Sequence, residues 1–313
     1  MKFRYIIFLP LFFLCTSLCS SQKTIISDKT NEGLTLVPGT RIYLRPPSWL
    51  RLSKDFMGLE NDDNEIVRFY DVFGKDYNVV SYKYSKEAYE DIGAIVYDFE
   101  EITIDKYPGK KLVTNSDYGE RAVTLVFGDT DFTVMAVAIL NDDNDTKISD
   151  LINSFKGIQY DKNREIGPME AAFFSIDIKN SGFKLFFRSN EIFHFTENGE
   201  EPSDVNVPSY VINQVLVDPV NPNLNLLVDN IINSSMGEGF KVVSRMQTSK
   251  DKINGYDSFQ ELVYGESEGV ETRIIFTAIH DGRRALVIMG SAKENFQENM
   301  EKFNQLTETV LFK

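Results

Sequence analysis

The chain has little of what disulfide bonds, thiol chemistry and metal sites are built from. Of its 313 residues only two are cysteine, two are histidine and one is tryptophan. Both cysteines, Cys15 and Cys19, lie near the N-terminus, so the rest of the chain can form no disulfide and carries no thiolate nucleophile or ligand. The histidines, His194 and His280, are fewer than a catalytic zinc site usually needs, and their spacing does not suggest one. No metal is therefore expected.

The chain also lacks a hydrophobic run long enough to span a bilayer. The N-terminal apolar stretch, Ile6–Leu14, contains Pro10 and is far shorter than the roughly 20 residues of a membrane-spanning helix. It follows the basic residues Lys2 and Arg4 and leads into small residues up to Ser21. A basic start, a short apolar middle and a small-residue end are typical of a secretory signal peptide. We therefore predict that residues 1–21 are a signal peptide and that the protein is exported to the periplasm or the cell surface.

Two forms of the exported protein stay open at this point. Cleavage after Ser21 would release a free protein that begins at Gln22. Thr16–Cys19 is an imperfect lipobox, because Leu18 stands where a small residue is preferred. Lipidation of Cys19 would tether the protein to a membrane. Membrane attachment is expected only through such a lipid.

Positive charge is scarce as well. The chain has 33 Lys and Arg against 47 Asp and Glu, a formal net charge of −14. Residues 1–21 contribute Lys2 and Arg4 and no acidic residue, so their removal would change the charge from −14 to −16. A field of that sign repels phosphate backbones and excludes nucleic acid as an expected partner.

What the sequence does contain is a pattern that occurs twice, a β-hairpin followed by an amphipathic helix. In the first half, Val123–Phe127 and Phe132–Leu140 flank a turn at Gly128–Asp131. The helix that follows carries Ile148, Leu151, Ile152 and Phe155 on one face. In the second half, Arg273–Ile279 and Ala285–Met289 flank a turn at His280–Gly282. The closing helix there carries Phe296, Met300, Phe303 and Val310.

A further helix and a similar turn phrase precede each hairpin. The turn phrases are Asp105–Gly109 and Asp251–Gly255. The first helix is predicted from the spacing of Ala88, Tyr89, Ile92, Ile95 and Phe99, and the second from Leu224, Leu227, Val228, Ile231 and Ile232. A tandem duplication is the simplest account. It predicts domains at 33–161 and 168–313, with the polar stretch Asp161–Glu165 as the linker.

The order of strands and helices predicts an α+β fold in which each domain is an antiparallel sheet covered by helices. Strict β-α-β alternation is absent, which argues against a parallel doubly wound sheet. Aromatic residues in the strands, Phe69, Phe73, Phe186, Phe193 and Phe195, are interpreted as packing under those helices. Trp49, the single tryptophan, is assigned to the core rather than to a partner surface.

Several phrases of the first half resemble the opening of PsbP/Mog1-like domains of uncharacterised exported bacterial proteins. They are Leu36–Thr40, Pro46-Pro47, Phe56–Gly58 and Ile66; Val126–Asp129, the β run after it and the closing helix are similar to that family's second half. The resemblance covers most of residues 33–160 and weakens over 170–313. It implies a helix-covered antiparallel sheet and, by analogy, an adaptor or scaffold role. It carries no functional residue to this chain.

One motif matches that of a serine hydrolase. Gly265–Gly269 reads G-x-S-x-G, with Ser267 at its centre. That chemistry requires a strand, a sharp turn and then a helix. Here β-type residues stand on both sides, which predicts a hairpin loop, with His280 at the far end of the second strand. We assign neither residue a catalytic role.

Two acidic stretches, Asn61–Glu65 and Asn141–Asp145, invite a calcium interpretation. Neither has the glycine or the distant bidentate glutamate of the familiar loop, so both are interpreted as solvated turns. The sequence thus predicts no catalytic residue, cofactor or metal. The favoured function is a non-catalytic binding or structural protein of the bacterial cell envelope, with another envelope protein as partner. The alternative is a hydrolase-type enzyme or a small-ligand or calcium-binding protein, with an unrecognised carboxylate site at the domain interface and rims near Asp62 and Glu266.

Overall fold

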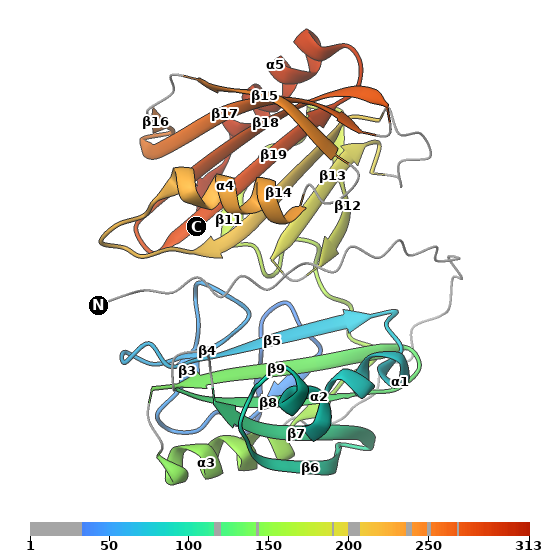
Figure 1. Cartoon of the computed structure of the whole chain (residues 1–313), viewed down its shortest axis with the longest axis vertical. Coiled ribbons are helices and arrows are strands. Elements are labelled where there is room, and N and C mark those ends of the chain that lie inside the picture. Colours follow the sequence, from blue (N-terminus) through green and yellow to red (C-terminus); the bar gives the residue numbers. More distant parts are fainter. Residues whose placement is uncertain are drawn as a thin grey trace. The chain divides into compact units, whose positions relative to one another are not determined.

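The computed structural model describes residues 33–115, 120–141, 144–189, 191–199, 207–235, 240–248, 252–267 and 269–313. Most of its regular structure is antiparallel β-sheet, with few helices (Figure 1). The chain divides into two compact units between Ala171 and Ala172. The predicted signal peptide and Cys19 lie outside the described residues, and both predictions stay open.

The first unit is built on a seven-stranded sheet of order β3-β4-β5-β9-β8-β7-β6. A smaller three-stranded sheet has the order β1-β2-β10. The strands are β1 Thr35–Leu36, β2 Ile42–Leu44, β3 Arg51–Leu52, β4 Gly58–Glu60, β5 Ile66–Phe73, β6 Val96–Ile104, β7 Tyr107–Asn115, β8 Arg121–Gly128, β9 Phe132–Leu140 and β10 Gln159–Tyr160.

Helices lie on both faces of the seven-stranded sheet. On one face α3 (Asp145–Lys156) buries Leu151 and Phe155 against the even-numbered residues of β9, among them Ala136. On the other face lie α1 (Tyr77–Val80), the 3-10 turn η1 (Ser81–Lys83) and α2 (Lys86–Asp91). The Tyr84 hydroxyl that follows η1 donates to Met135 Sδ at 3.0 Å, one residue from Ala136 and hence on the opposite face.

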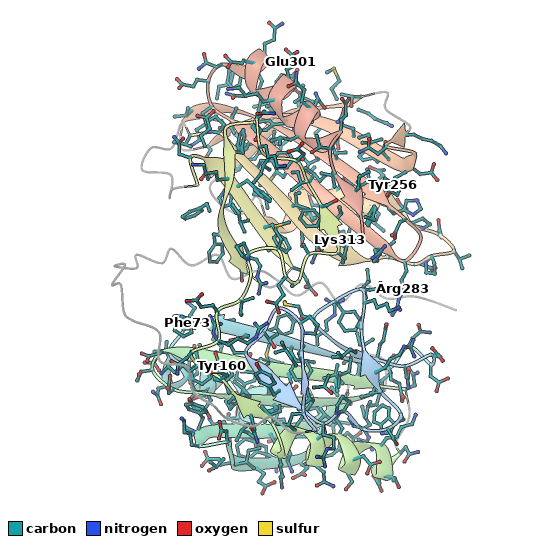
Figure 2. The ribbon with its side chains drawn as sticks, turned by 180° about the vertical axis from the view of Figure 1, so that it is seen from behind. Phe73, Tyr160, Tyr256, Arg283, Glu301 and Lys313 are labelled. Carbon is teal, nitrogen blue, oxygen red and sulfur yellow. The ribbon has the colours of Figure 1, made fainter. Side chains whose placement is uncertain are left out.

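Aromatic rings pack against one another in the core of the first unit. Tyr160, labelled in Figure 2, stacks on Phe132 with ring centroids 4.0 Å apart. Its hydroxyl donates to Asp71 at 2.9 Å, and Arg41 pairs with the same carboxylate. Tyr160 therefore anchors β10 to the body of the first unit.

The second unit is built on a larger sheet of order β12-β13-β14-β19-β18-β17-β15, with β16 paired to β17 off this path. A short pair joins β11 to β20. The strands are β11 Phe174–Ser175, β12 Phe183–Ser189, β13 Ile192–Glu197, β14 Ser209–Leu216, β15 Phe240–Thr248, β16 Lys252–Ile253, β17 Tyr256–Ser267, β18 Val270–His280, β19 Arg284–Ala292 and β20 Leu311–Phe312.

This sheet also carries one helix on each face. The helix α4 (Leu224–Ser235) packs Leu227 and Val228 with Phe276 and Val287. The helix α5 (Phe296–Thr307) lays Phe303 directly on Gly290, where an added Cβ would stand 2.4 Å from the ring. Val287 and Gly290 are three residues apart on β19, so α4 and α5 lie on opposite faces.

The two large sheets have the same strand order. The strands of the two sheets can be matched in chain order, and the order of neighbouring strands within the sheet is then the same in both. The matched strands are β3, β4, β5, β6, β7, β8 and β9 with β12, β13, β14, β15, β17, β18 and β19. The helices also occur at matching positions in the order of elements. The helices α1 and α2 correspond to α4, and α3 corresponds to α5. After the last helix of each unit, a two-residue strand pairs antiparallel with one near that unit's start.

Both predicted hairpins are confirmed, as are the helices around Phe155, Val228 and Phe303. The helix predicted through Phe99 is wrong beyond Asp91. Gly93 has φ +85°, a conformation that stops a helix, and β6 begins at Val96. The closing helix also ends before Val310, which is nevertheless buried.

The predicted linker contacts the first unit. Lys162 Nζ donates to Asp129 at 2.8 Å and to Asp131 at 2.6 Å. Arg164 donates to the carbonyl oxygen of Thr40 and pairs with Glu170, whose carboxylate accepts from the amide of Gly39 at 3.0 Å. The chain therefore leaves the first unit only after Glu170.

In the part of the chain that the structure describes, no helix has the length and apolar character needed to cross a membrane.

Candidate functional site

The G-x-S-x-G motif lies in a β-hairpin, as predicted. Ser267 is the last residue of β17 and pairs with Val270, and Gly269 makes the turn with φ +80°. His280 ends β18 at the opposite end of the hairpin, where its neighbour Ile279 pairs with Ser258. Nine residues of strand separate Ser258 from Ser267, about 30 Å. The serine and the histidine cannot form a nucleophile and base pair with each other.

The two histidines are not brought together either. His194 on β13 is three strands from β18, and the residue opposite it across those strands is Phe276, four residues before His280. Strand spacing and rise put the two histidines roughly 20 Å apart. The His194 Nε2 atom lies 2.6 Å from the Ser209 hydroxyl, and the ring of Phe186 packs edge-on against it. No group of three metal-ligating side chains occurs among the described residues.

The two acidic stretches meet in space, although about eighty residues separate them. Asn141 donates to the Asp63 carbonyl oxygen at 2.6 Å, and the buried Glu65 accepts from Lys147 Nζ at 2.8 Å. Asn61 closes the first stretch as an Asx turn by accepting from the amides of Asp63 and Glu65. Asn144 caps α3. Asp142 and Asp143 lie outside the described residues, so the calcium question stays a prediction for that stretch.

The predictions that the aromatic residues of the strands are buried are partly confirmed. Phe69, Phe193 and Phe195 are fully buried, as predicted, whereas Phe73 is exposed with Arg41 stacked on it. The prediction for Phe73 was wrong: it is the last residue of β5, and its ring is 54% exposed. Trp49 is partly buried against the first core, with Lys147 over its ring at 5.4 Å.

The surface that stands out is the segment Tyr77–Tyr97, here called the helical cap; its helices lie over one face of the first sheet, and its last two residues begin β6 (Figure 1). Local caps define its two short helices: Asp76 accepts from the amide of Asn78, and Ser85 accepts from the amide of Ala88. Helices of one turn or so are not stable alone. Tertiary contacts must therefore hold the helical cap.

Those contacts come from its inner side. The Tyr84 hydroxyl reaches Met135, and Lys110 Nζ of β7 donates to the carbonyl oxygen of Ser81 at 3.0 Å. Burial raises the pKa of Tyr84 to about 12, and it raises the pKa of Tyr89, whose hydroxyl bonds Thr124 of β8. Both phenols are neutral at physiological pH and act as anchors.

The outer side of the helical cap exposes large apolar side chains beside charged ones such as Lys86 and Glu87. Five apolar side chains are 50–78% exposed; they are Val79, Tyr82, Ile92, Ile95 and Tyr97. The Arg121 guanidinium stacks over the Tyr97 ring at the margin. Scattered exposed apolar residues are ordinary, but a group of large ones on one segment marks an interaction surface.

Sequence reasoning missed this surface because it assigned Ile92 and Ile95 to the apolar face of a longer helix. The signal against that assignment was Gly93, which stands between them. It ends the helix, and the two isoleucines then flank a turn instead of sharing a buried stripe.

No protein-family model matches this sequence, and no curated protein matches it. Among solved structures, this chain is similar to the PsbP protein of the cyanobacterium Synechocystis, at 8% identity and a TM-score of 0.29. That match covers 48% of this chain and 98% of the other. The resemblance to PsbP/Mog1-like domains predicted from the sequence is confirmed as a resemblance.

Two further solved structures are similar. LpqN of Mycobacterium tuberculosis, described as involved in cell envelope biogenesis, matches at 13% identity over 44% of this chain and 81% of its own, with a TM-score of 0.31. The immunity protein TplEi of the T6SS of Pseudomonas aeruginosa, solved with a peptide, matches at 8% identity over 90% of this chain and 99% of its own, with a TM-score of 0.33. At these scores the matches assign no function to this chain.

Proposed function

We propose that this protein is a non-catalytic binding protein of the bacterial cell envelope and that the helical cap is where it binds a partner protein. The observation that carries the proposal is the exposed apolar outer side of a segment whose inner side is fixed to the sheet. A rigid, exposed apolar surface favours association with another protein because its burial removes apolar area from water.

The fold on which this surface lies is, in the same proposal, a tandem duplication of one α+β domain with a helix layer on each face of the sheet. The shared strand order of the two large sheets supports it. The matching places of the helices and of the closing strands support it as well. An enzyme is the less favoured alternative, because the residues that suggested hydrolase chemistry lie at opposite ends of a hairpin.

The binding proposal is tested by placing a photo-cross-linking amino acid at position 92 or 82 in the protein expressed in its own host. We expect a discrete cross-linked species from both positions, since Ile92 and Tyr82 are among the most exposed apolar residues of the helical cap. The matched control position is Glu301, an exposed residue of α5 (Figure 2), and it should give no such species.

A second variant connects the cross-link to the apolar surface. Ile92→Asp combined with Tyr82→Ser should abolish cross-linking from position 95 while leaving the circular dichroism spectrum and unfolding midpoint unchanged. Both side chains are mostly exposed, so their replacement costs little stability. A folded double variant that still cross-links the same species would refute the proposal, as would equal cross-linking from position 301.

A further inference from the structure

The second unit carries an exposed edge strand, which is independent of the helical cap. The strand β15, Phe240–Thr248, ends the strand order of the large sheet and pairs only with β17. Among the described residues, no backbone hydrogen bond joins β15 to any other segment. An edge strand of nine residues presents a row of backbone N–H and C=O groups that another extended chain can pair with.

The helices of this unit pack over the interior of the sheet, where α4 contacts Phe276 and Val287 and α5 contacts Gly290. The helix α4 also reaches β15 through the ion pair of Asp229 with Arg245, but it leaves the strand exposed. Every residue from Lys241 to Gln247 is exposed. Figure 1 shows the strand at the end of the sheet.

The matching edge of the first unit is protected. On β6, Glu100 pairs with Lys111 of the next strand and with Lys156 of α3, and Asp98 also pairs with Lys111. Ile102 packs against the first core. The edge of β6 is also acidic, with Asp98, Glu100 and Glu101, and so repels an acidic strand. On β15 the charged residue tied to a helix is Arg245, which pairs with Asp229 of α4, and the strand contains no acidic residue.

The composition of β15 indicates what would pair with it. Val242, Val243 and Met246 are exposed apolar residues of types that favour strands, and β15 contains no acidic residue and no proline. Lys241 has no ion pair in the described part of the chain, whereas Arg245 is held by Glu261 and Asp229. In a chain of net charge −14, this edge offers an unpaired cation beside apolar side chains.

A second copy of the chain is a poor occupant. Two β15 strands in antiparallel pairing would place the same cations on one ladder. They would also bring together two copies of the bulge between Val242 and Ser244. Lysines and bulges on an edge are the features by which proteins prevent such self-pairing. An acidic strand from a different protein meets one copy of the bulge instead of two, and its carboxylates complement Lys241.

We propose that β15 is a docking edge for an extended segment of another protein, one that alternates apolar residues with carboxylates and pairs with β15 as an added strand. Main-chain hydrogen bonds supply the affinity in this mode of recognition, and alternate side chains supply the specificity.

The test uses a ten-residue synthetic peptide of alternating valine and glutamate and the protein in its exported form, labelled with ¹⁵N. We expect saturable binding with slowed hydrogen exchange at β15 amides, and no change at β6. N-methylation of alternate peptide residues should weaken binding by about tenfold or more, because it removes the main-chain donors. Lys241→Glu should reverse the preference, so that a valine–lysine peptide binds better than the valine–glutamate one.

Equal binding of the N-methylated peptide would overturn the proposal, and so would equal protection of β6. A concentration-dependent dimer whose β15 amides are protected without peptide would also overturn it, by showing that a second copy occupies the edge. The helical cap proposal is unaffected by each of these outcomes, since the double variant at Tyr82 and Ile92 leaves β15 intact.

Discussion

At the scale of single residues, the buried ion pair between Glu65 and Lys147 joins two stretches that the sequence treats as separate turns. Glu65 is fully buried, and its carboxylate accepts from Lys147 at 2.8 and 3.0 Å and from Asn61 at 2.6 Å. A buried carboxylate needs such partners because it has lost its water. The pair therefore fixes the start of α3 to the loop before β5.

Lys147→Met should consequently destabilise the protein by about 3–5 kcal/mol, the usual effect of leaving one charge of a buried pair uncompensated. Urea unfolding followed by circular dichroism measures this change. The control is Lys86→Met, which breaks the half-exposed pair of Lys86 with Glu90 at 3.7 Å and should cost less than about 1 kcal/mol. Equal losses in the two variants would contradict the importance of burial.

His194 provides a pH-dependent contribution to stability. Burial lowers its pKa below the ordinary value of 6.5. The unfolded chain then binds a proton more readily than the folded one, so stability is complete above about pH 6.5 and declines as the pH falls below it. With only two histidines in the chain, NMR titration of the ring protons can assign the value directly.

His194→Gln should flatten the pH dependence of unfolding free energy between about pH 7.5 and 5.5, because glutamine does not titrate. The matched variant His280→Gln retains His194 and should keep the dependence. A His194 titration midpoint at or above 6.5 would contradict the effect of burial.

At the scale of elements, the position of α5 depends on a glycine. Phe303 lies on Gly290 so closely that an added Cβ would stand 2.4–2.9 Å from its atoms. The same ring stacks on Tyr210, whose hydroxyl bonds Thr307 of α5. The amphipathic pattern of the helix predicts that Phe303 is buried, but only the pairing of the sheet puts Gly290 beneath it.

Gly290→Ala should therefore push α5 from the sheet and cost about 1–3 kcal/mol by overpacking. Thermal unfolding is a suitable measurement. Gly167→Ala is the control, since an added Cβ there meets nothing nearer than 3.6 Å, and its effect should stay within about 0.5 kcal/mol. An unchanged melting temperature for Gly290→Ala would show that α5 is not held in this way.

At the scale of the whole molecule, the boundary between the units can be tested with fragments. Lys162, Arg164 and Glu170 all bond residues of the first unit. A fragment of residues 33–171 should thus be more stable than one of residues 33–161 by about 3 kcal/mol, since each of the three residues adds at least one hydrogen bond that contributes roughly 1 kcal/mol when partly exposed to solvent. Fragments of equal stability would place the boundary where the sequence predicted it, at Asp161–Glu165.

Much of this architecture is predictable from local patterns. Alternation marks Phe132–Leu140 as a strand, and helical spacing places Leu151 and Phe155 on one face of α3. The prediction failed at Ile92 and Ile95. The helical spacing of apolar residues continues across Gly93, from Ala88 to Phe99, and so predicts one long helix. A pattern of apolar residues cannot tell a buried face from an exposed one, because both have the same period.

What the sequence determined by itself was a repeated order of strands and helices, the hairpin setting of Ser267 and the shortage of cysteine and histidine for metal or thiol chemistry. These properties depend on composition and on neighbours along the chain. Only the tertiary structure decided that the helical cap exposes large apolar side chains, that Glu65 meets Lys147 and that β15 is an exposed edge strand. Each of those features depends on which residues distant in sequence are brought together, and exposure is a property of the folded surface rather than of any segment.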